Sequence, residues 1–250
     1  RLPYGDKGLS TDSFTYEELG TDAEGNPLPK DNSQLVWSNA AFELGLKMSQ
    51  SHTAFGWCTA IRGLENGGKV EALPNLTFKS EAGDIQQQCP TEVNLTDERE
   101  KELSDLGFLP LVHYKNSDYA VFIGGQTTQK PKTFTDPDAT ANAAISARLP
   151  FIMASSRIAH YLKIMGRDKL GSNLEAADVS RDLNTWISQF TNPGAIGNEQ
   201  RAKTPLAESA IEVVEQPGKP GSYSAIAHLK PWLQMESLTT SVRMVAKIPG

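Results

Sequence analysis

Three runs of alternating apolar and polar side chains follow one another near the end of the chain. They cover residues 209–216, 223–231 and 238–248, and the prolines and glycines of 217–221 separate the first two. Alternation with a period of two predicts strands with one face on a core and the other on solvent. The C-terminal region therefore predicts a unit of three antiparallel strands.

Helical periods dominate the region before these strands. The strongest covers 138–165, where Pro150 predicts a kink or two abutting helices. A second helix is predicted at 174–190 and another at 37–55. Thr96 has the character of an N-cap and predicts a short helix that ends at Gly107.

Shorter apolar runs predict strands elsewhere, at 57–62, 70–73, 76–78, 91–95, 108–114 and 119–123. Residues 1–33 are polar and rich in glycine and proline, which predicts a loop. The order of elements is mixed, with strands and a helix first, then a long helix pair, then the strand unit. The chain therefore predicts an α/β fold of the mixed α+β kind.

The charge balance limits the class of partner. The chain carries 24 basic and 30 acidic residues, a net charge of -6, which argues against nucleic acid because phosphate binding needs a basic surface. No apolar run approaches the ~18–20 residues that a membrane-spanning helix needs. The two cysteines, Cys58 and Cys89, are too few for a disulfide scaffold or a four-cysteine zinc site.

Signatures of catalysis are missing from the sequence. It contains no phosphate-binding glycine loop, no nucleophile elbow and no zinc-protease motif. None of its four histidines has a second histidine or a cysteine at metal-ligand spacing. The sequence thus predicts no catalytic, cofactor-binding or metal-binding residue. An enzyme that uses His113 or His160 as a base is the alternative, and it would need a pocket that joins the histidine to a carboxylate.

Charged residues gather by sign on successive predicted helices. The helix after Thr96 is mostly acidic, which indicates a solvated or partner-facing surface. Region 138–171 is basic and the helix at 174–190 is acidic. Such opposite charges suit contacts between subunits, although ordinary surface charge is the simpler interpretation.

Seven short runs, in this order and spread over nearly the whole chain, resemble the large subunit of the type VI secretion contractile sheath (the TssC/VipB family). The runs are RLPYG at 1–5, GWCTAIRG at 56–63, CPTEV at 89–93, EKELSDLGF at 100–108, SRIAHYLK at 156–163, RDKLG at 167–171 and PGKPG at 217–221. Each run alone is weak, but together they are specific. Departures from the family pattern fall at residues 22–33, at Pro150 and at 191–199.

The resemblance implies a structural protein without a cofactor. Family members pair with a small sheath subunit (TssB/VipA), and the heterodimers stack in a helical polymer around a tube of Hcp rings on a baseplate. Contraction drives the tube into a target cell, and a ClpV-type ATPase then dismantles the sheath. The location implied is the bacterial cytoplasm, with neither nucleic acid binding nor membrane insertion.

The resemblance also implies a domain division and a phage tail-sheath-like fold. Residues 1–137 would be part of a middle sheath domain, and 138–250 an inner C-terminal domain with a mixed sheet, flanking helices and the antiparallel strand unit. The family's N-terminal half would lie outside this sequence.

Two sets of residues are candidates for contacts between subunits. The first is the last strand, which could pair with a neighbouring subunit or, equally, with a strand of its own chain; it comprises Thr239, Thr240, Ser241, Val242, Arg243, Met244, Val245 and Ala246. The second is an acidic helix face that could contact the tube, made of Glu175, Asp178, Arg181 and Asp182. A sheath subunit of another contractile injection or phage-tail lineage is the alternative assembly protein.

Overall fold

The computed structural model describes residues 37–74, 77–79, 83–168, 175–215, 223–232 and 242–247. These residues form two compact units. The first comprises the described parts of Arg1–Lys47 and Arg62–Gly124, and the second those of Met48–Ile61 and Gly125–Gly250. The mixture of helices and antiparallel strands confirms the predicted fold class. The loop predicted at 1–33 and the turn at 217–221 lie outside the described residues.

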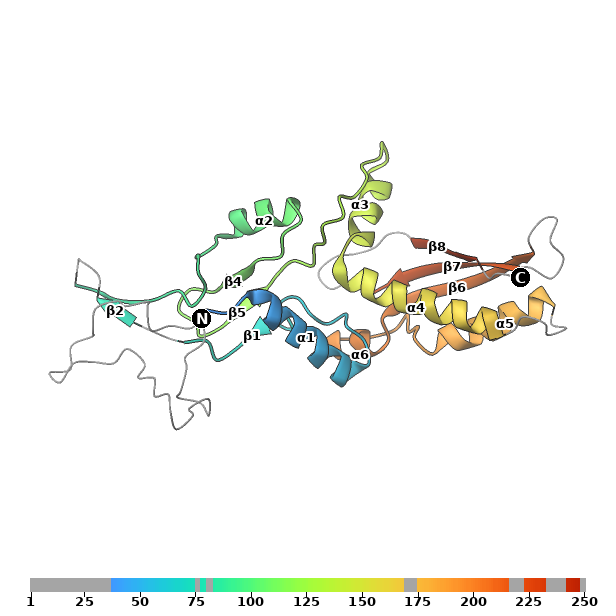
Figure 1. Ribbon diagram of the computed structural model, residues 1–250, viewed down its shortest axis with the longest axis horizontal. Helices are drawn as coiled ribbons and strands as arrows, with labels where there is room; N and C mark the ends of the chain where they lie inside the picture. The colour runs from blue at the N-terminus through green and yellow to red at the C-terminus, as the bar shows by residue number, and fades with distance from the viewer. Residues whose placement is uncertain are drawn as a thin grey trace. The chain divides into compact units, whose positions relative to one another are not determined.

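The first unit is built around a small antiparallel sheet in the order β1-β5-β4 (Figure 1). Its strands are β1 (Lys69–Val70), β4 (Leu111–His113) and β5 (Ala120–Phe122), and a separate hairpin joins β2 (Thr77–Lys79) to β3 (Ile85–Gln87). All three residues of β5 are at most 1% exposed, so the central strand forms the core of this unit. Helix α1 (Ala40–Phe55) begins here and ends in the second unit at Gly56, whose φ of 77° suits a helix end.

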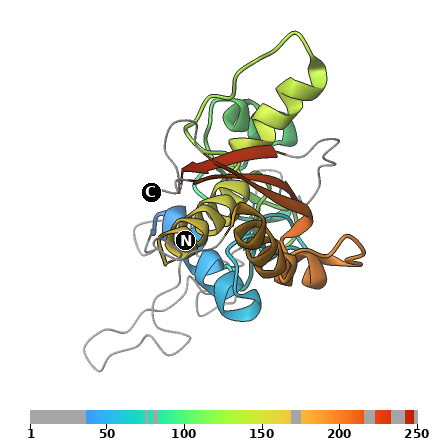
Figure 2. The ribbon, with the colours of Figure 1, turned by 90° about the vertical axis from the view of Figure 1, so that its right-hand side faces the viewer.

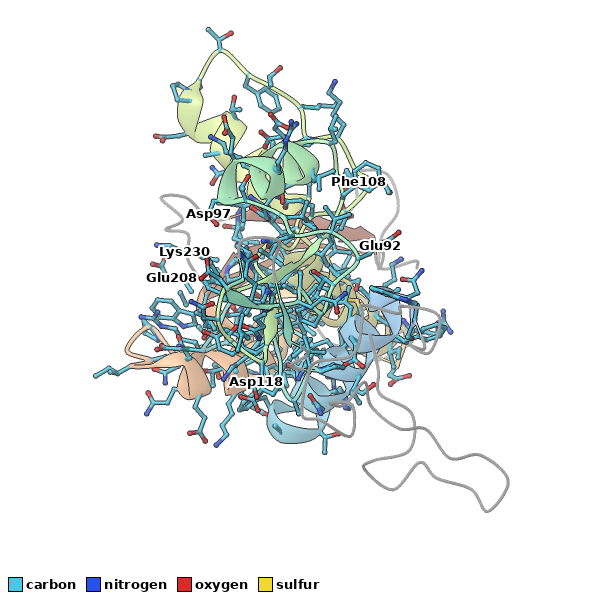
Figure 3. All side chains as sticks on the ribbon, turned by 90° about the vertical axis from the view of Figure 1, so that its left-hand side faces the viewer. Glu92, Asp97, Phe108, Asp118, Glu208 and Lys230 are labelled. Carbon is cyan, nitrogen blue, oxygen red and sulfur yellow. The ribbon has the colours of Figure 1, made fainter. Side chains whose placement is uncertain are left out.

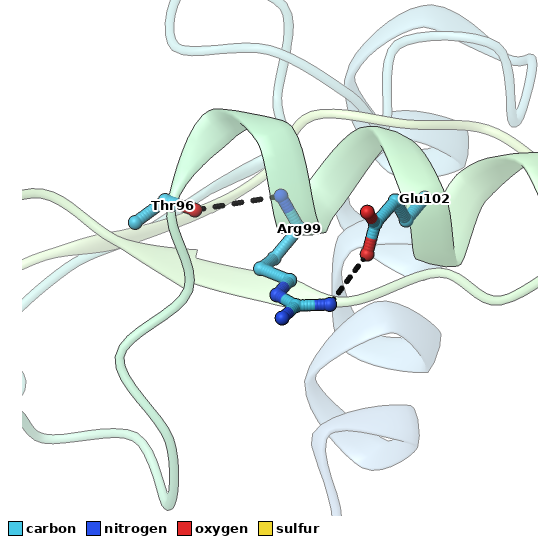
Figure 4. A network of polar contacts seen from close by, with 3 residues as sticks. All are labelled: Thr96, Arg99 and Glu102. Carbon is cyan, nitrogen blue, oxygen red and sulfur yellow. Dashed lines mark hydrogen bonds and ion pairs between the residues drawn. The ribbon is translucent and has the colours of Figure 1, made fainter.

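Helix α2 (Asp97–Asp105) begins at the predicted cap. The Thr96 hydroxyl accepts a hydrogen bond from the Arg99 amide at 3.4 Å, and the Arg99 side chain pairs with Glu102 at 2.7 Å (Figure 4). This ion pair is well exposed and contributes little to stability. The carboxylates of the first turn are favoured by the helix dipole, and the cap explains why a helix with so few apolar side chains starts at this residue.

Residues 57–62 do not form the predicted strand. Ile61 is 1% exposed, so the apolar run is buried as expected, but its backbone follows an irregular path. The Ser51 hydroxyl donates to the Trp57 carbonyl at 2.7 Å and accepts from the Ala60 amide at 3.2 Å. A single buried serine of α1 therefore satisfies two backbone groups of this segment without strand pairing, and burial alone was the correct inference from these side chains.

The strand predicted at 91–95 is also wrong. The Thr91 hydroxyl donates to the Val93 carbonyl two residues later at 3.0 Å, and the Val93 side chain is 60% exposed. A threonine side chain that bonds nearby backbone stabilises turns at the expense of strands.

The long helical period at 138–165 forms two helices, as Pro150 predicts. Helix α3 (Pro137–Ser146) is capped by the Asp136 carboxylate, and α4 (Leu149–Asp168) begins anew. Pro150 lies in the first turn of α4, where a missing N–H costs nothing. The Leu149 amide donates instead to the Gly125 carbonyl at 2.7 Å, which fixes the position of the break.

The second unit packs α4 and α5 (Ala176–Ser188) on one face of a three-strand sheet (Figure 2). The sheet is antiparallel in the order β6-β7-β8, formed by Leu206–Glu215, Tyr223–Pro231 and Val242–Lys247, and α6 (Asn198–Lys203) precedes it. The three-strand unit is thereby confirmed. The core between helices and sheet contains Trp57, Ala154, Ile158, Leu162, Val179, Leu183, Ile187, Leu206, Ile211, Ala225, Ala227 and Leu229.

Candidate functional site

The two edges of the C-terminal sheet differ in how their backbone groups are satisfied. At the β6 edge, the Asn184 side chain of α5 donates to the Ile211 carbonyl at 2.7 Å and accepts from the Ile211 amide at 3.0 Å. The Ser180 hydroxyl also donates to this carbonyl at 3.1 Å. Asn184 thus makes the hydrogen bonds that another strand would make, so this part of β6 is closed to a partner strand.

A second contact closes the beginning of the same edge. The Leu206 amide donates to the Phe190 carbonyl at 3.1 Å, and the Asn192 amide donates to the Leu206 carbonyl at 2.9 Å. The hydroxyls of Thr191 and Ser209 are 2.8 Å apart. The segment after α5 therefore occupies the first part of the β6 edge, at Leu206 and Ser209.

Strand β8 forms the opposite edge. It pairs with β7 over six residues, from Ser224 with Lys247 to Leu229 with Val242. Of the candidate strand residues, Val242–Ala246 lie on β8 and are paired within their own chain, whereas Thr239–Ser241 lie outside the described residues. No strand in the described part of the chain pairs with the second edge of β8. Pairing with another subunit at that edge stays a prediction.

The face of this sheet opposite α4 and α5 is lined by polar residues at its end. Glu208 of β6 and Lys230 of β7 are opposite each other in the register, and their charged atoms are 2.7 Å apart (Figure 3). Val214 farther along β6 is 50% exposed. This face is half polar, as in many antiparallel sheets that are covered on one side only.

The four residues of the acidic candidate face lie at the beginning of α5. Glu175 occupies the N-cap position, and Asp178 pairs with Arg181 at 2.6 Å, one turn apart. Asp182 follows and is exposed. The buried side of the helix carries Val179, Leu183 and Ile187, so the charged residues point away from the sheet.

Arg157 of α4 lies at the centre of an aromatic cluster. Its guanidinium is 4.7 Å from the Trp57 ring centroid and 5.8 Å from that of Tyr161, and it donates to the Gly56 carbonyl. Burial raises the pKa of the neighbouring Cys58 thiol, and the positive charge of Arg157 opposes this only in part. The thiol is therefore held in its unreactive neutral form, as its apolar surroundings predict.

The two histidines considered as bases make structural contacts. His113 is 7% exposed, and its Nε2 lies 2.9 Å from the Ser117 carbonyl. The His160 ring packs against that of Tyr161, with centroids 6.4 Å apart. Within the described ranges, no group of three or more His, Cys, Asp or Glu side chains is arranged to hold a metal ion.

A groove of about 960 Å³ lies in the first unit and is lined mainly by residues 37–43 and 87–95. Its lining includes the carboxylates of Glu43 and Glu92 together with Val70 and Leu111, and no histidine. This groove therefore does not provide the pocket that an enzyme with His113 or His160 as a base would need. No helix among the described residues combines the length and apolar character of a membrane span.

Comparison with known proteins matches both parts of the chain to one family. Residues 1–129 match a model described as EvpB/VC_A0108, tail sheath N-terminal domain, and residues 138–248 match EvpB/VC_A0108, tail sheath gpW/gp25-like domain. The chain is 43% identical over 252 aligned positions to the type VI secretion system sheath protein TssC1 of Pseudomonas aeruginosa. This alignment covers 100% of the chain and 49% of the relative, so the chain spans about half of that protein's length.

Proposed function

Because the chain belongs to the EvpB/VC_A0108 tail sheath family, we propose that it is a structural subunit of a type VI secretion contractile sheath and has no enzymatic role. The match of both parts of the chain to sheath domains carries this proposal. The name of the relative favours a secretion sheath over another contractile injection or phage-tail lineage.

The proposal includes a set of partners. The chain would join a small sheath subunit and further copies of itself in a helical polymer around an Hcp tube, attached to a baseplate, in the bacterial cytoplasm. A ClpV-type ATPase would act on the full-length sheath. The domain boundary between residues 137 and 138 belongs to the same proposal.

Contraction requires subunits that stay linked while their interfaces change. Packed interfaces have discrete alternative arrangements, and rigid bodies move between them. A strand shared between subunits keeps them tethered, because its backbone hydrogen bonds do not depend on which side chains meet elsewhere. We infer that the outer edge of β8, with which no described strand pairs, takes part in such a link, since α5 closes the edge of β6 at Ile211.

Electron microscopy of the full-length protein co-expressed with a small sheath subunit tests both the sheath function and the role of the last strand. We expect tubular polymers from the natural pair. Deletion from Leu238 onward should abolish the tubes while leaving the two subunits associated. Absence of tubes from the natural pair would contradict the sheath function, whereas tubes from the truncated protein would contradict only the role of the last strand.

The acidic face of α5 is proposed to meet the tube. Its net charge would match a basic tube surface, and its residues are turned away from the core of their own unit. Replacing Glu175, Asp178 and Asp182 by lysine should release Hcp tube from purified sheaths in a sedimentation assay. The matched variant Glu208→Lys, which changes charge on the opposite side of the sheet, should retain it. Equal retention by both variants would remove α5 from the tube contact.

A further inference from the structure

The turn after α2 displays two apolar side chains to solvent. Leu106 is 75% exposed and Phe108 is 61% exposed. Between them, Gly107 adopts a φ of 90°, a conformation that glycine reaches without strain. We call Leu106, Gly107 and Phe108 the α2 tip.

Backbone hydrogen bonds hold the α2 tip in one conformation. The Phe108 amide donates to the Leu103 carbonyl and the Gly107 amide to the Ser104 carbonyl, both at 3.0 Å. This pair of bonds is the Schellman motif, which ends helices with a left-handed glycine. The two exposed side chains are therefore presented by an ordered turn, and their exposure is built into its geometry.

Helix α2 is also held firmly against the rest of its unit. The Ser104 hydroxyl donates to Glu100 at 2.7 Å, and both groups lie over Gly124. A Cβ at Gly124 would come within 3.1 Å of the Ser104 hydroxyl and 3.4 Å of the Glu100 carboxylate. The close approach leaves little room for the helix to rotate and bury its tip.

The surroundings of the α2 tip are negative. Five carboxylates lie on α2, namely Asp97, Glu98, Glu100, Glu102 and Asp105, against the two basic residues Arg99 and Lys101. Glu102 is paired with Arg99, and Glu100 accepts from Ser104. A partner for the tip should therefore combine exposed apolar side chains with positive charge.

Helix α4 carries a surface of this kind along one edge of its exposed side, where the Tyr161 ring also packs against Trp186 of α5 with the centroids 5.9 Å apart. Tyr161 and Ile164 are one turn apart and are 41% and 40% exposed, and the exposed Arg167 follows one turn after Ile164. The exposed Lys163 lies one turn before Arg167, on the next row of the helix surface. No ion pair joins Lys163 or Arg167 to another residue in the described part of the chain. We call these four residues the α4 face.

We propose that the α2 tip of one copy of this chain docks on the α4 face of a second copy in the sheath. The inference rests on the proposed function, because only a polymer brings these surfaces together repeatedly. Leu106 and Phe108 would cover Tyr161 and Ile164, and the α2 carboxylates would surround Lys163 and Arg167. Apolar contact inside a ring of opposite charges is the usual composition of a protein interface.

Charge reversal in two separate chains tests the contact. One chain carries Glu98→Lys and Asp105→Lys, and the other carries Lys163→Glu and Arg167→Glu, each co-expressed in full length with the small subunit. Each alone should yield about tenfold less sedimentable sheath than the natural protein, because attraction becomes repulsion at every contact. A mixture of the two chains should restore assembly when the two kinds of copy alternate. The reversed tip of one chain then meets the reversed α4 face of the other, and the natural tip meets the natural face, so that opposite charges meet at both contacts.

Several results would overturn the proposal. Undiminished sheath from either variant would do so, and so would a mixture that stays defective, because rescue in trans requires a contact between copies. Loss of the small subunit from either variant would assign the surface to that partner instead. The exposed residue Glu65 offers a control, and Glu65→Lys should assemble normally. Failure of the natural protein to polymerise in the same assay would contradict the proposed function itself. This outcome is distinguishable from a failed docking proposal, in which the natural protein assembles.

Apolar substitutions provide a second readout that does not depend on charge. Leu106→Ser combined with Phe108→Ser should lower sheath yield about tenfold, since both side chains would leave a buried contact. Ile85→Ser removes a side chain that is 73% exposed in the same unit and should have no effect. Equal yields from the two variants would contradict a role for the tip.

Discussion

Replacing Gly68 by alanine is expected to destabilise the first unit by about 3 kcal/mol, because the added methyl group has no space. Its Cβ would lie 2.6 Å from both the Arg62 Cα and the Gly63 nitrogen. These are backbone atoms, so no side chain can turn aside. The same loop supports the central strand, since the Phe122 amide donates to the Gly68 carbonyl at 2.9 Å and the Gly63 amide to the Phe122 carbonyl at 2.8 Å.

Urea unfolding together with hydrogen exchange of the Phe122 amide measures this effect. The amide should lose protection in Gly68→Ala because its acceptor has to move. The control is the same substitution at Gly45 in α1, where nothing lies within 4 Å of an added Cβ. There alanine should stabilise the helix by about 1 kcal/mol, since glycine costs more conformational entropy. Equally small changes in the free energy of unfolding for Gly68→Ala and Gly45→Ala would show that the loop around Gly68 moves to accommodate the methyl group.

Local rules predicted several elements correctly because a few neighbouring residues decide them. Thr96 was expected to cap a helix, and its hydroxyl accepts the Arg99 amide. Pro150 was expected to divide a long helical period, and α4 begins one residue before it. The alternation after residue 209 predicted a three-strand unit, in which Ile211 and Ala227 face the core. Each of these signals lies within a few residues of the feature it predicts.

Features that depend on distant residues were not predictable in this way. The apolar run at 57–62 indicated burial but could not reveal that Ser51 satisfies its backbone. Nor does the sequence show that Leu106 and Phe108 stay exposed, since both fit the pattern of core residues. For the last strand, the sequence left open whether it pairs within its own chain or with a neighbouring subunit, and the structure shows that β7 of the same chain pairs with one of its edges.

Asn184 closes the edge of β6, a role that the sequence did not reveal. It lies in a helix with a strong apolar face, where a lone asparagine gives no sign of its partner. In the structure it replaces a strand at the edge of β6. Asparagine is a poor helix former, so its presence in α5 indicates some specific contact. The sequence does not show which residue that contact involves.

We expect Asn184→Leu to lower the free energy of unfolding by about 2–3 kcal/mol, although leucine favours helix more than asparagine does. The Ile211 amide would lose its acceptor inside a partly buried site, and its carbonyl would keep only the Ser180 hydroxyl. Hydrogen exchange at Ile211 should accelerate, and urea unfolding should shift to lower concentration. Thr185→Ala is the matched control, because this side chain bonds only to the Arg181 carbonyl on the exposed side of the same helix.

Asn184→Leu also distinguishes two effects of exposing the edge of β6, namely lower stability and wrong strand pairing. If Asn184 serves only stability, Asn184→Leu will unfold more easily but still form sheaths of normal structure at low temperature. If it also prevents wrong strand pairing, the variant will form irregular aggregates while still folded, because unpaired backbone on β6 can accept a strand from another chain. We expect the second result, because α5 and the segment after it cover the edge of β6 at Leu206 and Ile211, whereas no strand among the described residues pairs with the outer edge of β8. A folded variant without added aggregation would restrict Asn184 to a role in stability.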